Sequence, residues 1–321
     1  MKINRLIFIC PVILLSISLG ISELYPVRKG DKCGYIDTKG NMIIAAQFAS
    51  ADRFSEGLAK VSIDFKCGYI DKNGQFVIAP RADLWTAGKF SNGLARMYAE
   101  SKYGYMDRTG KTVISPQFKV AEDFSESLAL VVIDQKFGYI NRAAKFVIKM
   151  RFDRAGLFHE GLARAESSGK TGYINKAGRW AIKPIFNNAW DFSESLAAIK
   201  TGDSWGYINH QGKTVINPRF LMALEFHEGK AAVNIGGKYG YVNKAGNIII
   251  EPQFDLAGNF SEGLASIQKN QMYGYIDSTG KALIPPQFDY ALDFRDGIAG
   301  IGLADKWGYI DITGKYIWEP E

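Results

Sequence analysis

One internal repeat governs this sequence. A Gly-Tyr pair occurs nine times, and successive pairs are 34 residues apart in seven cases and 36 residues apart in one. The glycines of these pairs are Gly34, Gly68, Gly104, Gly138, Gly172, Gly206, Gly240, Gly274 and Gly308. A unit of this length cannot bury a core alone, so its copies must stack into an array.

The repeat accounts for residues 23–321 as one domain of nine units. Leu24 lies ten residues before Gly34, as Leu264 lies ten before Gly274, so the first unit is complete. The one long unit carries its two extra residues between Pro80 and Phe90. No room remains for a second domain.

Each unit contains short runs rich in β-branched and aromatic residues. These runs read L-A-x-V, G-Y-I and K-x-V-I, and they predict three strands per unit. A D/N-x-x-G turn, such as Asp37 to Gly40, joins the second strand to the third, because Asx caps the turn and Gly accepts positive φ. Unit four has Ala144 in place of this Gly, which predicts strain or a different loop.

Residues that recur in every unit are expected to serve the fold. The tyrosines of the Gly-Tyr pairs and the phenylalanines of the F-S-E-G segments are therefore predicted core residues. The acids of F-S-E-G are interpreted as structural, because Asn92 and Asp296 stand at the same position in other units, and a turn tolerates exchange of an acid for an amide whereas acid–base catalysis does not. These acids are Glu56, Glu126, Glu160, Glu194, Glu228 and Glu262.

The segment Lys306-Trp307-Gly308-Tyr309-Ile310-Asp311 resembles the WG (KWG) repeat of bacterial proteins, as does Trp205-Gly206-Tyr207-Ile208. The resemblance covers residues 23–321 and implies a β-repeat module without catalytic residues. The sequence departs from the family at the Trp position, which holds Cys33, Cys67, Tyr103, Phe137, Thr171, Trp205, Tyr239, Tyr273 and Trp307.

Two all-β architectures fit this pattern. One is an open, solenoid-like array of three-stranded antiparallel units, and the alternative is a β-propeller-like ring, in which the F-x-x-A-x-x-F stretch supplies a short fourth strand. Nine equal units, with no split unit to close a ring, favour the open array.

Cys33 and Cys67 occupy the same position in adjacent units and form a candidate disulfide if the units stack tightly. The alternative is that two small side chains fill an aromatic position.

The first 22 residues have the pattern of a signal peptide. A short basic start precedes an apolar run that ends in small residues, which predicts cleavage near residues 20–22. The alternative is an uncleaved anchor, and contact with a membrane is expected only through this segment. The protein is therefore expected to be exported to the periplasm, the cell surface or the medium.

The sequence offers little for catalysis. His159-Glu160 and His227-Glu228 begin like a zinc motif, but Ala163 and Ala231 replace the second His. With three Cys and three His in all, no metal site, no cofactor and no enzymatic activity are expected. The net charge of +6 is spread along the chain, which argues against a nucleic-acid partner.

The remaining interpretation is a binding protein. Tryptophans and amides concentrate in units five and six, and these residues are the candidate ligand-binding set: Trp180, Trp190, Trp205, Asn187, Asn188 and Asn209. Packing between units is the alternative role for them. The first functional hypothesis is an exported, non-enzymatic scaffold for an unknown protein partner, and the alternative is a module that binds carbohydrate or cell-wall glycan.

Overall fold

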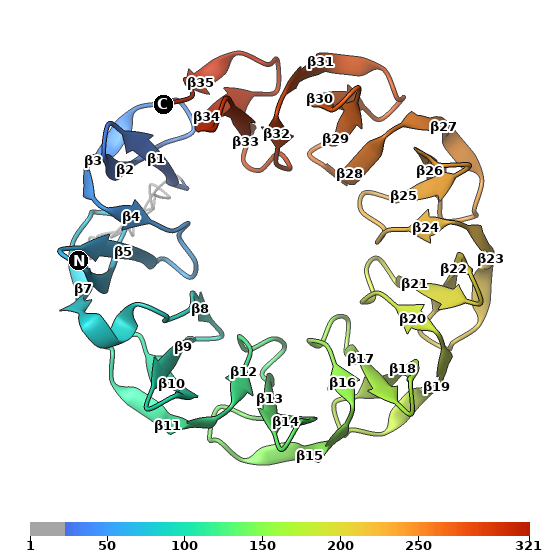
Figure 1. Cartoon of the computed structure of the whole chain (residues 1–321), viewed down its shortest axis with the longest axis horizontal. Coiled ribbons are helices and arrows are strands. Elements are labelled where there is room, and N and C mark those ends of the chain that lie inside the picture. The colour runs from blue at the N-terminus through green and yellow to red at the C-terminus, as the bar shows by residue number, and fades with distance from the viewer. Residues whose placement is uncertain (1–22) are drawn as a thin grey trace, which may run out of the picture.

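The computed structural model describes residues 23–321, which form a closed ring of nine antiparallel β-sheets (Figure 1). Each sheet is one blade of a β-propeller. Eight blades have four strands, and the first has three. The signal peptide expected at residues 1–22 lies outside the described residues.

The strands of each blade follow the chain from the centre of the ring outward. The inner strands are β4 (Ser50–Ala51), β8 (Phe90–Ser91), β12 (Val120–Ala121), β16 (Arg154–Ala155), β20 (Asn188–Ala189), β24 (Met222–Ala223), β28 (Leu256–Ser261) and β32 (Tyr290–Ala291). The second strands are β1 (Tyr25–Lys29), β5 (Ala59–Ile63), β9 (Leu94–Ala99), β13 (Ala129–Ile133), β17 (Leu162–Ser167), β21 (Leu196–Thr201), β25 (Lys230–Ile235), β29 (Leu264–Lys269) and β33 (Ile298–Leu303).

The third strands carry the Gly-Tyr pairs. They are β2 (Lys32–Ile36), β6 (Lys66–Ile70), β10 (Lys102–Asp107), β14 (Lys136–Ile140), β18 (Lys170–Asn175), β22 (Ser204–Asn209), β26 (Lys238–Asn243), β30 (Met272–Asp277) and β34 (Lys306–Asp311). The outer strands are β3 (Met42–Phe48), β7 (Phe76–Arg81), β11 (Thr112–Phe118), β15 (Phe146–Phe152), β19 (Trp180–Phe186), β23 (Thr214–Phe220), β27 (Ile248–Phe254), β31 (Ala282–Phe288) and β35 (Tyr316–Trp318).

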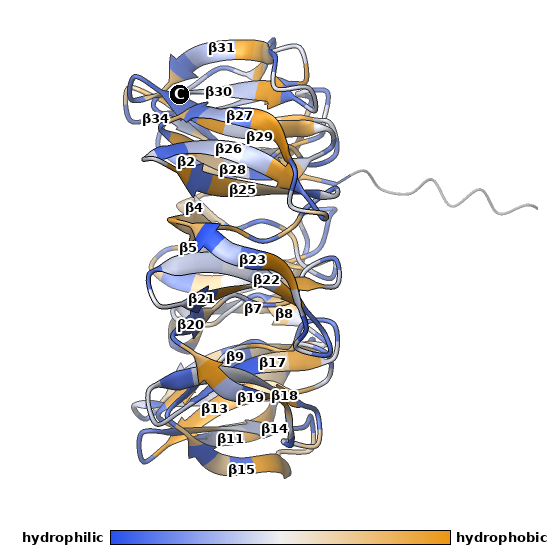
Figure 2. Ribbon diagram, turned by 90° about the vertical axis from the view of Figure 1, so that its right-hand side faces the viewer, coloured by the Kyte–Doolittle hydropathy of each residue, from blue (hydrophilic) through white to orange (hydrophobic). Residues whose placement is uncertain are grey.

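The strands run between the two faces of the ring, as the edge-on view in Figure 2 shows. We call one face the hairpin face: it holds the tight turns between the second and third strands and the connections between blades. The other, the turn face, holds the F-S-E-G and D/N-x-x-G turns. One short helix, η1 (Ala82–Leu84), lies in the connection that carries the two extra residues. No helix within residues 23–321 has the length and apolar character needed to cross a membrane.

The all-β tandem repeat is confirmed, but the preference for an open array was wrong. The F-x-x-A stretch adds the short fourth strand in most blades, as Ser50 and Ala51 do by pairing with Ser62 and Val61. In blade three the inner strand is instead Phe90–Ser91. Closure also needs no split unit, because side chains join the last blade to the first.

The Gly of each Gly-Tyr pair is required by close backbone approach. At Gly34, a Cβ atom would lie 2.5 Å from the carbonyl oxygen of Ile44, at a bulge where the pairing between β2 and β3 changes register. The neighbouring Tyr35 is fully buried and packs against Phe54 in a tilted arrangement. Its hydroxyl donates to the carbonyl of Asp52 in the next blade (2.8 Å). These aromatic residues therefore belong to the core, as predicted, and this core lies between neighbouring blades.

The turn at Ala144 keeps the standard loop. Its amide donates to the carbonyl of Asn141 (3.0 Å), as the glycines do in other units, while its φ is +60°. An alanine is thus held in the left-handed region, so of the two outcomes predicted for this turn the structure shows strain.

The first and last blades meet without sharing a sheet. The first blade has no inner strand among the described residues, and the Tyr25 ring packs instead against Tyr309 of the last blade (5.6 Å between centroids). The Tyr25 hydroxyl donates to the Asp296 carboxylate (2.6 Å), and the Tyr309 hydroxyl donates to the carbonyl of Pro26 (3.0 Å).

Candidate functional site

The recurring carboxylates of the turn face bind neighbouring blades. The Glu56 carboxylate accepts hydrogen bonds from the amides of Asn92 (2.6 Å) and Gly93 (2.9 Å), which form the same turn one blade later. Glu126, Glu160, Glu194, Glu228 and Glu262 repeat this link to the next blade. These carboxylates therefore hold neighbouring blades together, which agrees with their structural interpretation from the sequence.

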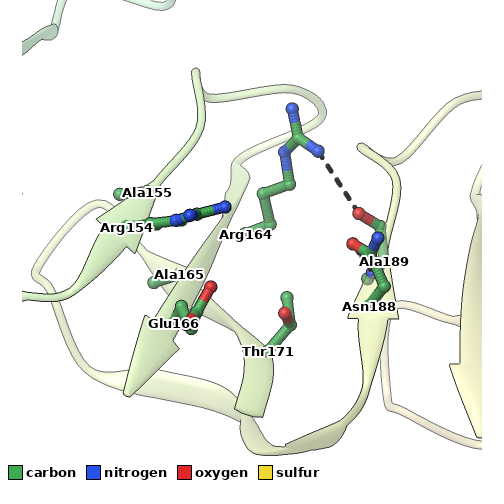
Figure 3. A pocket seen from close by; sticks show the side chains of 8 residues that line it. All are labelled: Arg154, Ala155, Arg164, Ala165, Glu166, Thr171, Asn188 and Ala189. Atoms are coloured by element: carbon green, nitrogen blue, oxygen red, sulfur yellow. Dashed lines mark hydrogen bonds between the residues drawn. The ribbon is translucent and has the colours of Figure 1, made fainter. Parts of the chain in front are cut away.

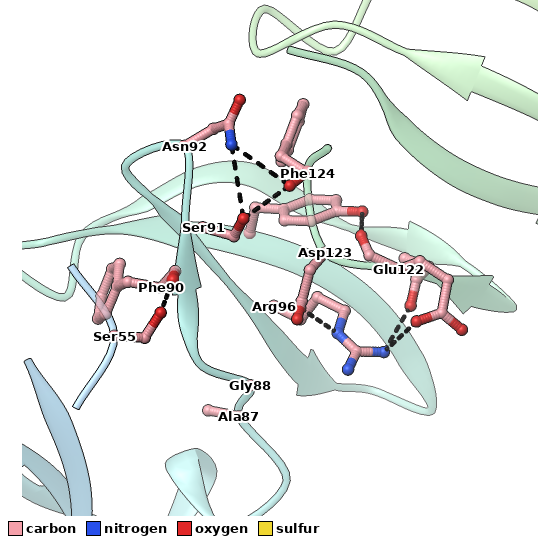
Figure 4. Close-up of polar contacts among 12 residues, drawn as sticks. Ser55, Ala87, Gly88, Phe90, Ser91, Asn92, Arg96, Glu122, Asp123 and Phe124 are labelled. Carbon is pink, nitrogen blue, oxygen red and sulfur yellow. Dashed lines mark hydrogen bonds and ion pairs between the residues drawn. The ribbon is translucent and has the colours of Figure 1, made fainter. Parts of the chain in front are cut away.

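Several basic side chains also clamp neighbouring blades. Figure 4 shows Arg96, on β9, paired with Asp123 (2.9 Å) and Glu122 (3.1 Å) of the next blade. Arg96 also donates to the carbonyl of Ala121 (2.9 Å). Arg164 holds the same repeat position on β17. Functional groups must therefore be sought among residues that depart from the repeat.

The clearest departure is a group of aromatic side chains on the hairpin face of blades two and three. Phe65 lies at a hairpin tip with 92% of its surface exposed and a φ of +58°. Trp85, beside η1, is 55% exposed, and Tyr98, near the next hairpin tip, is 36% exposed and packs against Tyr103 in a tilted arrangement (4.9 Å between centroids). We call Phe65, Trp85 and Tyr98 the aromatic patch.

The two-residue insertion positions this patch. The short helix η1 packs against both β6 and β9, which follow Phe65 and contain Tyr98. Its Leu84 is fully buried in one cluster with Cys67 and Met97, and thereby covers the small Cys67 side chain. With Leu84 anchored, the adjacent Trp85 is presented to solvent. The sequence contained this signal as the only irregular spacing, but the spacing alone does not show where the inserted residues point.

A second departure forms a pocket between blades five and six (Figure 3). Its volume is about 250 Å³, and it is lined by Arg154, Arg164, Glu166, Thr171, Asn188 and Ala189. These residues stand where β16, β18 and β20 begin and β17 ends, so the pocket lies toward the hairpin face.

Thr171 is the departure from the repeat that lines the pocket. It occupies the Trp position, where blade six has Trp205, which is buried in a core cluster against which Met222 and Ile235 of the next blade pack. The small Thr171 side chain occupies less of this space than Trp205 does in blade six. The sequence showed this departure, although it could not show which side chains surround it.

Arg164 is fixed at one edge of the pocket. Its Nε atom lies 3.0 Å from the Asp191 carboxylate, it donates to the carbonyl of Ala189 (3.3 Å), and it lies over the Trp190 ring (5.7 Å). Burial raises the pKa of Asp191, while Arg164 and His159 oppose that shift. The Arg154 side chain has no ion pair or hydrogen bond to any residue in 23–321.

The candidate ligand-binding residues do not form one site. Trp190 and Trp205 stack on each other (5.9 Å), but Trp205 is buried, whereas Trp180 packs on Phe152 in an outer strand. Asn209 caps its own turn by accepting from the amides of Gln211 and Lys213 on the turn face. Asn187 accepts from the amide of Gly202 on the hairpin face, and only Asn188 lines the pocket.

The candidate disulfide is not formed, because Cys33 and Cys67 are both free thiols. They pack in separate clusters, one on each side of the second blade. Each occupies the aromatic position of its unit, as the alternative interpretation stated. Among residues 23–321, no group of three or more His, Cys, Asp or Glu side chains is arranged to hold a metal ion.

Comparison with known proteins identifies the family. The model of the WG containing repeat matches eight successive segments from residue 34 to residue 307. This chain belongs to the WG containing repeat family. No curated protein matches the sequence.

Several solved structures are similar to this chain at low sequence identity. A crystal structure of a eukaryotic initiation factor is similar over 94% of this chain and 96% of its own, with 10% identity and a TM-score of 0.70. The dihydro-heme d1 dehydrogenase NirN matches 83% of this chain and 74% of its own, with 13% identity and a TM-score of 0.48. Kluyveromyces lactis Hsv2p matches 60% and 74%, with 9% identity and a TM-score of 0.42.

Proposed function

We propose that this member of the WG containing repeat family is an exported, non-enzymatic scaffold that binds a protein partner through its hairpin face. The observation that carries the proposal is the aromatic patch, in which Phe65, Trp85 and Tyr98 are exposed where the repeat is broken. Exposed aromatic residues on a rigid framework are typical anchors of protein interfaces. The glycan alternative has weaker support, since Trp205 is buried and Arg164 lies over Trp190.

Site-specific photo-crosslinking in the native cell tests this proposal. A photoreactive phenylalanine analogue at position 65 is expected to give a discrete adduct with one protein. The matched control is Gln135, which lies at the same hairpin tip two blades further on, is also exposed, and has a similar φ (+62°). The Trp85→Ala variant should reduce the adduct at position 65. Identical adducts at both positions, or none at position 65, would contradict the proposal.

Export is tested separately. Residues 1–22 fused to a reporter enzyme that is active only outside the cytoplasm should give activity, and replacing the apolar run with polar residues should abolish it. An inactive fusion would remove export from the proposal and leave the binding surface unaffected.

A further inference from the structure

We propose that the pocket between blades five and six binds a carboxylate, supplied by an Asp or Glu side chain of the protein that covers the hairpin face. This inference rests on the proposed function, because it assigns partner chemistry to the same face. It is carried by the pocket's geometry and by its unmatched hydrogen-bond donors.

The pocket lies beside a small residue at the Trp position of the repeat. In blade six Trp205 is buried at this position, and in blade two Leu84 covers Cys67. Blade five has Thr171, and the space beside it remains open with a volume of about 250 Å³. Thr171 is 8% exposed, and its hydroxyl makes no hydrogen bond to any residue in 23–321.

The pocket also contains hydrogen-bond donors that have no acceptor among residues 23–321. Arg154 extends across the pocket toward Arg164 in Figure 3 and has no acceptor among residues 23–321. The Asn188 side-chain oxygen accepts from the Ala189 amide (2.8 Å), which leaves its NH₂ group available. Together with the Thr171 hydroxyl, these groups present donors from three strands to one space, and a planar carboxylate matches a guanidinium best.

Glu166 selects among acidic ligands. It is the cross-strand neighbour of Arg154 on β17 and lines the same pocket. Its carboxylate repels a simple anion, but it accepts a hydrogen bond from an N–H group beside the ligand's carboxylate. A peptide carries such an amide next to each acidic side chain. The pocket also lacks an exposed aromatic face on which a sugar ring would stack, which favours the peptide over a uronic acid.

Two substitutions separate binding from folding. Thr171→Tyr fills the pocket with the residue that blades seven and eight carry at this position, Tyr239 and Tyr273, so the ring should remain folded. Arg154→Gln removes the free guanidinium from an exposed position. The matched control is Arg28→Gln, an exposed arginine of the first blade that lies outside the pocket.

The test is an NMR titration of residues 23–321 with an acetylated, amidated tripeptide Gly-Glu-Gly. The neutral Gly-Gln-Gly peptide at equal ionic strength and free glucuronate are the comparison ligands. Saturable chemical-shift changes are expected with the Glu peptide and not with the comparison ligands. The affinity for the Glu peptide should fall about tenfold or more in Arg154→Gln. The shift changes should be absent in Thr171→Tyr, and the affinity should be unchanged in Arg28→Gln. Equal response to the Gln peptide, tighter binding of glucuronate, or no saturable shift at millimolar peptide would overturn the inference.

The cross-linking experiment distinguishes this inference from the proposed function. If Thr171→Tyr leaves the adduct at position 65 undiminished while Trp85→Ala reduces it, the hairpin face is the interface and the carboxylate assignment fails. If neither variant changes the adduct, the aromatic patch itself is excluded.

Discussion

The contact between the last and first blades differs from the contacts between the other blades. Inside the ring, Tyr275 packs on Phe294 of the following F-S-E-G segment (4.8 Å), and Glu262 binds the amide of Gly297 in the following turn (2.9 Å). At the junction no such segment follows Tyr309 within the described residues, and Tyr25 takes its place. One large residue thus substitutes for the phenylalanine and for the turn contact.

This difference shows how an array of equal units closes. The second residue of each L-A-x-V segment is Ala in blades two to nine, and only the first blade has a large residue there, Tyr25. The open edge of β1 is also protected, because Pro26 has no amide hydrogen to offer and its carbonyl accepts from Tyr309. The cost of closure without an inner strand is visible at Trp307, which is 50% exposed, whereas Trp205 at the same repeat position is 3% exposed.

The largest effect is expected for Tyr25→Ala. Removing this buried ring should lower the free energy of unfolding by about 3–5 kcal/mol, as loss of a core aromatic does. Phe294→Ala is the internal counterpart and should cost a similar amount, while Phe65→Ala, at a site that is 92% exposed, should change stability by less than about 0.5 kcal/mol. Urea denaturation followed by tryptophan fluorescence measures all three. A Tyr25→Ala cost no greater than that of Phe65→Ala would show that Tyr25 does not close the ring.

The next effect concerns the tyrosine hydroxyls. Inside the ring the Tyr139 hydroxyl donates to the carbonyl of Gly156 (2.6 Å) in a fully buried contact, while the Tyr309 hydroxyl bond to Pro26 is only partly buried. Tyr139→Phe leaves a buried acceptor unsatisfied and should cost about 1–3 kcal/mol; Tyr309→Phe should cost less, about 0.5–1.5 kcal/mol, because water reaches Pro26. Denaturant midpoints in the reverse order would contradict this comparison.

A smaller, stabilising effect is expected at Ala144. Ala144→Gly removes the strain of a positive φ and should raise the free energy of unfolding by up to about 1 kcal/mol. The gain is reduced by the loss of the packing contact between the Ala144 methyl group and its core cluster. The matched control is Gly178→Ala, which introduces the strained residue at the equivalent turn and should destabilise the protein. Equal stability of Ala144→Gly and the natural protein would show that the turn is already relaxed.

The smallest effect is a dependence on acid pH. Burial opposes ionisation of Glu126, but the hydrogen bonds from Lys176 and the Gly161 amide, together with the Lys176 charge, outweigh it and lower the pKa of this carboxyl. A lowered pKa contributes stability above the unfolded value of about 4.3, and that contribution is lost as the pH falls through the folded value. Glu126→Gln should therefore flatten part of the stability loss on acidification. If the free energy of unfolding fell with pH in parallel for Glu126→Gln and the natural protein, Glu126 would not contribute to the acid dependence of stability.

The sequence predicted the units and their elements because each depends on local rules. The Gly-Tyr pair lies at a bulge, and the Asx residue caps its turn. The regular spacing of the Gly-Tyr pairs gives the number of blades. The inner strand is only two residues long in most blades, such as Ser50–Ala51, so no periodicity could show it. Closure could not be predicted either, because the relevant partners, Tyr25 and Asp296, are 271 residues apart.

The candidate site was harder to predict for a physical reason. In a repeat, the position within the unit decides where a side chain lies, so tryptophans close in sequence separate between an outer strand and the core, as Trp180 and Trp205 do. Departures from the unit were the better guide. The irregular spacing before Phe90 and the small Thr171 are both visible in the sequence, but their neighbours, Cys67 and Arg154, are brought to them by the fold.

Closure by side chains also bears on how the chain folds. Each blade is made from one contiguous segment, so every strand pairing joins residues near in sequence, which favours rapid formation of single blades and growth along the chain. The two ends of the domain must meet only for the junction between the first and last blades, where Tyr25 packs on Tyr309 and the Tyr309 hydroxyl donates to Pro26. The ring is therefore expected to form as an arc of completed blades first, with the junction closing last and opening first during hydrogen exchange.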